Sequence, residues 1–261
     1  KNCIEKFDTN EYKIVVILNF NGGGVEYVSQ TLIEYIQPYI TSRFYSTFRH
    51  GKYLNEYYRI NFTDNSIVET CEIPSKEYVI NNIVTIDYGE GVKNFITKPF
   101  RRFGQHREEY NKHKKSLKHK RKPNEILIFT DGYSASSASL FTKSLQNEGG
   151  AIIVGYNGNP KLGKELFDAS ESPTNVWTFS QNKEYLNLYN LGFKINGISA
   201  SESFGDDYKE KNVKPREYQF DPIDERVDIF NPYTEETDQI FIDKAKEIFN
   251  KYNKDKKCNK N

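Results

Sequence analysis

The chain has 261 residues, enough for one large domain or two small ones and for a sizeable hydrophobic core. Its 37 Lys and Arg residues nearly balance its 36 Asp and Glu residues, so the net charge of +1 gives no overall field that favours nucleic acid or a membrane surface. Hydrophobic residues make up only 36% of the chain, but aromatic residues reach 15%, which indicates a globular protein. No apolar run approaches the roughly 18 to 20 residues of a membrane-spanning helix.

The first element is a near-continuous apolar run over residues 13–20 (KIVVILNF). Such a run predicts a β-strand that is buried on both faces of a parallel sheet. It ends in the turn Asn21–Gly24, and apolar residues at helical spacing follow as far as Pro38. The sequence therefore predicts a strand, a glycine turn and a helix in succession.

The next part of the chain is less regular. Residues 40–88 contain short stretches rich in aromatic residues, which we interpret as an irregular surface insertion with some helix. Residues 89–122 hold twelve Lys and Arg residues, eleven of them from Lys98 onward. Because no nucleic-acid-binding motif accompanies them, we predict a solvated basic insertion and no nucleic-acid partner.

A second unit follows at residues 125–129, a buried strand that leads into a serine-rich turn and a helix to about residue 146. Glycines at 149–150 end this helix, and residues 151–154 form a third buried strand. Strand, helix and strand within about thirty residues favour a right-handed βαβ crossover.

Towards the carboxyl end, residues 170–180 predict an extended or mixed segment, and residues 213–230 a return strand with turns. Residues 237–252 have the periodicity of an amphipathic helix. The whole pattern predicts an α/β fold and a single domain over residues 1–252, with a polar tail over residues 253–261.

Both turns carry chemistry. If the strands before them share a parallel sheet, the turns emerge at the same carboxyl edge, where α/β proteins place their sites. A serine on a tight strand-to-helix turn, with helix amides aimed at it, is the geometry of a nucleophile. Four serines compete for this role, namely Ser134, Ser136, Ser137 and Ser139. The small residues could instead serve close packing of helix on sheet.

The glycine turn offers backbone amides that no side chain shields, which suits an oxyanion hole. A phosphate-binding loop and a plain tight turn are the alternatives. The phosphate reading is weaker because the Lys-Ser/Thr of a P-loop is missing.

Together the two turns resemble those of the tail-specific, or carboxyl-terminal-processing, serine peptidases, especially the secreted fungal branch of that family. Asn21–Gly24 matches the family's glycine turn, Asp131–Ser136 its serine turn, and Gly149–Gly155 the glycine and strand that follow. The resemblance implies a ClpP/crotonase-like core with aromatic-rich and basic insertions. It also implies a serine endopeptidase that acts on peptides or proteins without a metal or other cofactor.

The resemblance implies roles for individual residues as well. Ser136 matches the nucleophile, and the amides of Ser137 and of Gly23 and Gly24 match the oxyanion hole. The general base has two candidates. Much of the family uses a buried lysine a little over twenty residues after the serine, and Lys161 stands at that place.

Another branch of the family uses a histidine and a glutamate. Glu210 and Glu217 resemble the glutamate region, but none of His50, His106, His113 and His119 has a matching context. A triad would therefore take its histidine from upstream of Lys1. Because the chain begins close to its first strand without a Met, we expect it to be a piece of a longer precursor. The glycosylation sequon Asn61-Phe62-Thr63 fits a secretory route, and the resemblance to the secreted branch implies a secreted protein.

Two departures favour a second hypothesis. The family's acidic residue after the last motif serine is replaced by Leu140 or Ser139, depending on the register, and no PDZ-like module is recognisable. The alternative is a catalytically inactive, peptidase-like domain that binds peptides or partner proteins.

Overall fold

A computed structural model describes residues 6, 8–38, 45–51, 65–70, 72–88, 91, 93–102, 118–158, 161–173, 177–178, 190, 197–198, 201–210, 213–229 and 234–254. Its contacts divide the chain into two compact units. Unit 1 comprises residues 1–41, 112–171 and 220–261, and unit 2 comprises residues 42–111 and 172–219. Where the sequence predicted one domain over residues 1–252, the chain thus passes repeatedly between two units. The three cysteines, the sequon at Asn61 and the tail from residue 255 lie outside the described residues.

Unit 1 has an α/β fold built on a four-stranded sheet with the strand order β1-β7-β8-β12. Every neighbouring pair is parallel. The strands are β1 (Ile14–Leu18), β7 (Ile126–Thr130), β8 (Ile152–Gly155) and β12 (Glu225–Arg226). This confirms the α/β class and the β-α-β order predicted for residues 125–154.

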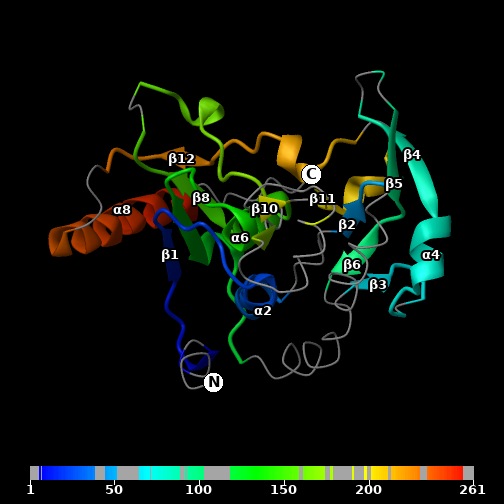
Figure 1. Cartoon of the computed structure of the whole chain (residues 1–261). Coiled ribbons are helices and arrows are strands. Elements are labelled where there is room, and N and C mark those ends of the chain that lie inside the picture. Colours follow the sequence, from blue (N-terminus) through cyan, green and yellow to red (C-terminus); the bar gives the residue numbers. More distant parts are fainter. Residues whose placement is uncertain are drawn as a thin grey trace, which may run out of the picture. The chain divides into compact units, whose positions relative to one another are not determined.

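Helix α6 (Ser136–Asn147) joins β7 to β8, whereas α2 (Glu26–Ile36) follows β1 and the chain then enters unit 2 before it returns to β7. The two helices pack against each other (Figure 1). Both crossovers step in the same direction along the sheet, so the right-handed rule puts both helices on one face. Two short 3₁₀ helices, η2 (Pro123–Glu125) and η3 (Lys164–Leu166), complete the connections.

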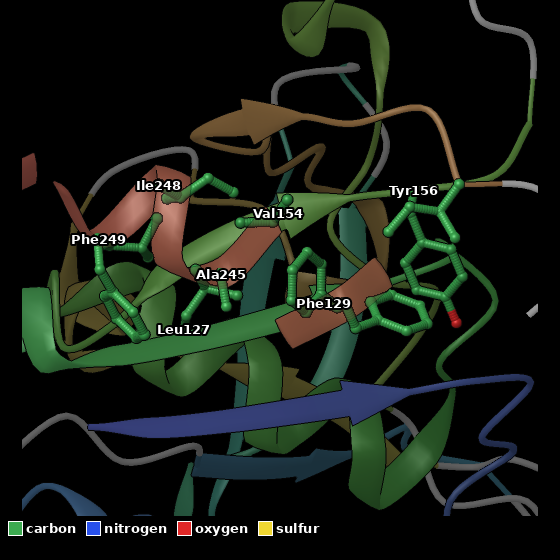
Figure 2. Packing of buried hydrophobic residues seen from close by; sticks show 10 residues of the cluster. Leu127, Phe129, Val154, Tyr156, Ala245, Ile248 and Phe249 are labelled. Carbon is green, nitrogen blue, oxygen red and sulfur yellow. The ribbon is translucent and has the colours of Figure 1, made fainter. Parts of the chain in front are cut away.

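The C-terminal helix α8 (Glu235–Lys254) covers the sheet face that carries Leu127 and Phe129. Figure 2 shows Ala245, Ile248 and Phe249 of this helix turned towards the strands. Phe241 adds edge-on contacts to Phe129 and Tyr156, with ring centroids 4.8 and 5.0 Å apart. The amphipathic pattern of residues 237–252 therefore predicted this packing correctly.

The prediction for the first strand needs a correction. β7 is fully buried along its length, but β1 exposes Val15 and Ile17 by 37% and 40%. The reason is position, because β1 lies at the edge of the sheet and β7 lies inside it. An apolar run alone does not distinguish these two places.

Unit 2 consists mostly of antiparallel strands. Its larger sheet has the order β11-β2-β6-β3, and β4 and β5 form a separate hairpin. The elements are β2 (Tyr45–Phe48), β3 (Asn65–Ile67), α4 (Lys76–Asn81), β4 (Ile83–Asp87), β5 (Lys93–Thr97), β6 (Phe100–Arg102), β9 (Trp177–Thr178), β10 (Gly197–Ile198), β11 (Ser201–Phe204), η5 (Asp206–Lys209) and η6 (Arg216–Tyr218).

Two of these strands, β5 and β6, fall in the segment predicted to be a basic insertion over residues 89–122. Residues 103–117 of that segment lie outside the described residues. In the described part of the chain, no helix combines the length and the apolar character needed to cross a membrane.

Candidate functional site

The glycine turn and the serine turn leave the sheet side by side. β1 pairs with β7 so that Leu18 lies opposite Thr130, the last residue of each strand. Both turns therefore begin at one carboxyl edge, as the sequence predicted. The buried hydroxyl of Tyr156, which directly follows β8, donates to the Leu18 carbonyl at 3.0 Å. This bond links the residue after β8 to the last residue of β1.

Hydrogen bonds hold the two turns together. The Ala135 amide donates to the Asn21 carbonyl at 3.0 Å. The Asp131 carboxylate accepts the Phe20 amide through Oδ2 at 2.6 Å and the Tyr133 amide through Oδ1 at 2.9 Å. Asp131 is only 4% exposed, so these charge-assisted bonds are shielded from water. One carboxylate thus fixes the start of both turns.

Gly23 is the point of closest approach between the turns. Its φ of +98° is a conformation that side chains disfavour. A Cβ atom built there would lie 2.7 Å from the Ala135 oxygen and the Ser136 Cβ, and 3.0 Å from the Ser137 nitrogen. Only glycine allows the turn to sit directly against the residues that begin α6.

The four serines of the turn differ in access and in hydrogen bonding. Ser134 and Ser139 are fully buried, and Ser137 is 5% exposed. Ser139 Oγ is engaged by Ser170 Oγ at 2.9 Å and by the Glu171 carbonyl. Ser136 alone is half-buried, and its hydroxyl has no hydrogen-bond partner among the described residues. It is the serine that a substrate could reach.

Ser136 also has an unusual backbone. Its φ of +51° lies in the left-handed region, which only a few per cent of residues other than glycine adopt. Such strain costs on the order of 1–3 kcal/mol and is concentrated at functional sites. Ser136 therefore differs from the other three serines both in its solvent exposure and in its backbone conformation.

The predicted oxyanion donors differ in whether their backbone amides are already used. The Ser137 amide belongs to the first turn of α6, where helix donors have no intrahelical acceptor. The Gly23 amide is already used, because it donates to Asn21 Oδ1 at 3.0 Å. The Gly24 amide has no acceptor among the described residues. Of the three predicted oxyanion donors, only Gly23 already donates its amide; the Ser137 and Gly24 amides have no acceptor among the described residues.

The structure does not bring a general base to Ser136 among the residues it describes. Lys161 follows β8 and its side chain is exposed, whereas a lysine base needs burial to lower its pKa. His119 precedes β7, so it lies at the opposite end of the strand from the serine turn. His50, Glu210 and Glu217 belong to unit 2, and His106 and His113 lie outside the described residues.

The two glutamates of unit 2 have different surroundings. Both carboxylate oxygens of Glu217 accept the Ser203 amide, at 2.9 and 3.0 Å. Glu210 is exposed at the end of η5.

A buried ion cluster on the helix of Ser136 was missed from the sequence. Lys143 lies two turns after Ser136 on α6 and its side chain is 1% exposed. Its Nζ lies 2.6 Å from Asp221 Oδ2 and 3.6 Å from Asp168 Oδ1. A lysine among small and apolar helix residues was the only signal for it, and its partners are far away in sequence.

Residues 168–171 run along the same helix and are fastened to the serine turn. The Thr130 hydroxyl donates to the Ala169 carbonyl at 2.8 Å, and the Glu171 amide donates to the Ser134 carbonyl at 2.8 Å. The turn that carries Ser136 is therefore braced on both sides, by the glycine turn and by this segment.

Two exposed aromatic rings stand next to the two turns in the chain. Phe20 and Tyr133 stack with their centroids 5.3 Å apart and their planes 6° from parallel. They are 55% and 54% exposed, and each is adjacent to one of the two turns. The stacked rings offer an exposed apolar surface at the start of the two turns.

Within the described residues, no group of three or more His, Cys, Asp or Glu side chains is arranged to hold a metal ion. Comparison with known proteins finds no matching family model, no matching curated protein and no matching solved structure. The function therefore has to be inferred from the geometry of the site.

Proposed function

We propose that the protein is a serine hydrolase with Ser136 as its nucleophile. One observation supports this most directly: the half-buried Ser136, at a φ of +51°, is packed against a glycine turn whose φ is +98° at Gly23. A turn that serves packing alone has no need for strain at an accessible hydroxyl.

The proposed reaction is acyl transfer to water. Ser136 Oγ attacks the carbonyl carbon of the substrate while a base takes its proton, and the carbonyl oxygen becomes an oxyanion. The amides of Ser137 and Gly24 donate to that oxyanion, and such donors are typically worth about 3 kcal/mol each. The tetrahedral intermediate expels a protonated amine and leaves an acyl-serine, which water then hydrolyses to a free acid and restores the hydroxyl.

The base in this proposal is Lys161 of unit 1, which follows β8 and has to become shielded from water beside Ser136 to act. Asp131 acts through the turns rather than on the substrate. By holding the Phe20 and Tyr133 amides, it keeps the Gly24 and Ser137 donors in register with Ser136.

At a finer level, we propose a peptidase of the tail-specific processing family with a ClpP/crotonase-like core, acting on peptides or proteins in a secreted setting. The order of the motifs supports it: a glycine turn after β1, a serine turn after β7 and a crossover to β8, all on parallel strands. The stacked Phe20 and Tyr133 rings suit a peptide with apolar side chains.

A fluorophosphonate probe tests the nucleophile. We expect the wild-type chain to be labelled at Ser136 and Ser136→Ala to lose labelling completely. Ser137→Ala is the matched control, because it removes the neighbouring hydroxyl but keeps the amide, and it should retain labelling. Equal labelling of wild type and Ser136→Ala would refute the assignment.

A second function is favoured by one specific observation. No base contacts Ser136 Oγ among the described residues, which is what an inactive peptidase-like domain that binds peptides would show. The same probe distinguishes the two, because a binding domain would not be labelled at Ser136. Such a domain would still bind peptides, and Ser136→Ala would leave their affinity unchanged.

A further inference from the structure

The two edges of the unit 1 sheet are built differently. β12 forms one edge with two charged residues, of which Glu225 pairs with Lys251 and Arg226 donates to the Gly155 carbonyl at 3.2 Å. Short, charged strands are a common protection of a sheet edge against pairing with another chain. β1 forms the other edge with five uncharged apolar residues, Ile14–Leu18. The β1 edge therefore lacks the protection that β12 has.

The outer backbone of β1 is available for pairing. An edge strand presents N–H and C=O groups that point away from its single neighbour, here β7. Outside the β1–β7 ladder, the Tyr156 hydroxyl on the Leu18 carbonyl is the one hydrogen bond to β1 in the described part of the chain. Lys13, the nearest cation in the sequence, holds its Nζ 4.5 Å from the centroid of the Phe249 ring on α8.

One face of β1 is only partly covered. Val15 and Ile17 lie opposite Leu127 and Phe129 of β7, so all four side chains share one face of the sheet. α8 packs on Leu127 and Phe129 but leaves Val15 and Ile17 exposed by 37% and 40%. Two branched aliphatic side chains thus remain in water beside an unprotected strand edge.

The exposure pattern of β1 reads the same from both ends. Ile14 and Leu18 are buried, Val15 and Ile17 are exposed, and Val16 between them is intermediate. An antiparallel copy of β1 centred on Val16 therefore places Val15 of each copy opposite Ile17 of the other, on the same face. Since the strand carries no charge, this register opposes no like charges. β1 is thus self-complementary, as an interface between two identical chains requires.

We propose that the protein dimerises by antiparallel pairing of β1 with β1 of a second copy, which joins the two unit 1 sheets into one. The outer backbone groups form the ladder, and Val15 and Ile17 cover each other across it. Because the paired strands run in opposite directions, the turns that follow them leave at opposite ends of the pair. This proposal does not depend on the chemistry of Ser136.

Sedimentation equilibrium on the full chain tests the association. We expect a monomer–dimer equilibrium with a Kd on the order of 10–100 µM, because one strand pair buries less surface than a standard protein interface. A wild-type chain that stays monomeric up to about 500 µM would overturn the proposal. So would a monomeric chain that binds a peptide copying residues 13–19, because the edge would then accept a strand from a different partner.

Two single variants probe the interface. Val15→Lys and Ile17→Glu should each raise the Kd of the dimer at least about 10-fold, because each places an unpaired charge against an aliphatic side chain. Ile240→Lys is the control, since it adds a charge at an exposed position of α8 and should keep the wild-type Kd. Circular dichroism spectra verify that all three variants are folded. If the two β1 variants dimerise like wild type, the copies meet on another surface and the proposal is wrong.

An equal mixture of Val15→Lys and Ile17→Glu tests the register. In the proposed pairing, the introduced lysine of one chain lies opposite the introduced glutamate of the other, and the second contact keeps its native valine and isoleucine. The mixed dimer should therefore form with a Kd within about 5-fold of wild type, although neither variant pairs well with itself. A mixture that associates no better than the single variants would overturn the proposed antiparallel register.

Discussion

Ser136 in unit 1 and Thr47 in unit 2 both carry a hydroxyl without a hydrogen-bond partner among the described residues, but their surroundings differ. Ser136 is half-buried, has a φ of +51° and lies beside backbone amides of a helix start. Thr47 is fully buried in a regular strand and faces apolar side chains. An unpaired hydroxyl alone therefore does not indicate a nucleophile. Access and backbone strain are what single out Ser136.

The largest expected effect concerns the support of the Ser136 helix. Lys143→Met leaves Asp221 and Asp168 without their buried cation, so the free energy of unfolding should fall by about 3–5 kcal/mol in urea titrations. Adding Asp221→Asn should recover part of this loss. Lys244→Met breaks an exposed pair with Glu247 and should change stability by less than about 1 kcal/mol. If Lys143→Met and Lys244→Met lost similar amounts of stability, the buried cluster would contribute no more to the free energy of unfolding than an exposed ion pair does.

Gly23→Ala should separate the two turns that make Ser136 distinctive. The added Cβ collides with Ala135 and Ser136 backbone and side-chain atoms at 2.7 Å, so the rate of probe labelling or hydrolysis should fall about 10²- to 10³-fold. Gly22 has no neighbour within 4 Å of an added Cβ, and Gly22→Ala should keep most of the activity. Equal rates for the two variants would exclude a close role of the glycine turn.

Asp131→Asn should have a smaller effect on the same region. The asparagine has one acceptor oxygen where the carboxylate has two, so either the Phe20 or the Tyr133 amide loses its bond. We expect kcat to fall about 10-fold with little change in KM, because the turns move but substrate contacts remain. Asp87→Asn, at an exposed turn of unit 2, is the control. A change in KM alone would place Asp131 in substrate binding instead.

The smallest effect belongs to the core next to Thr47. Burial and a hydrogen bond to Glu202 raise the pKa of Tyr88 well above its usual value of about 10. The unfolded chain therefore ionises Tyr88 first, so the bond to Glu202 stabilises the fold below about pH 10, and this contribution declines as the pH rises further. Tyr88→Phe should lower stability by about 1 kcal/mol at pH 8, and the difference from wild type should shrink at pH 11.

Tyr12→Phe is the reference for this titration, because Tyr12 is 79% exposed. It should match wild type at both pH values. A gap between wild type and Tyr88→Phe that widens above pH 10 would contradict the assigned direction. Labelling of Ser136 should be the same in all three proteins, which would keep the two regions separate.

Much of unit 1 could be predicted from the sequence. Its strands are short apolar runs that end in glycine or serine turns, and α8 has a regular apolar face, so local pattern and local structure agree. The same holds for the pairing of the two turns, since parallel strands bring their carboxyl ends to one edge. Unit 2 was predicted only as irregular, because its short antiparallel strands are stabilised by partners far along the chain.

The sequence by itself determined the α/β class, the order of the parallel strands' turns and a short list of serines. Only the tertiary structure decided which serine is accessible, that β1 is an edge strand and that Lys143 is buried between two carboxylates. The same is true of Asp131, whose role depends on its hydrogen bonds to two turns that are far apart in the chain. Periodicity reports how a residue relates to its chain neighbours, whereas burial, strain and hydrogen bonding depend on segments that only folding brings together.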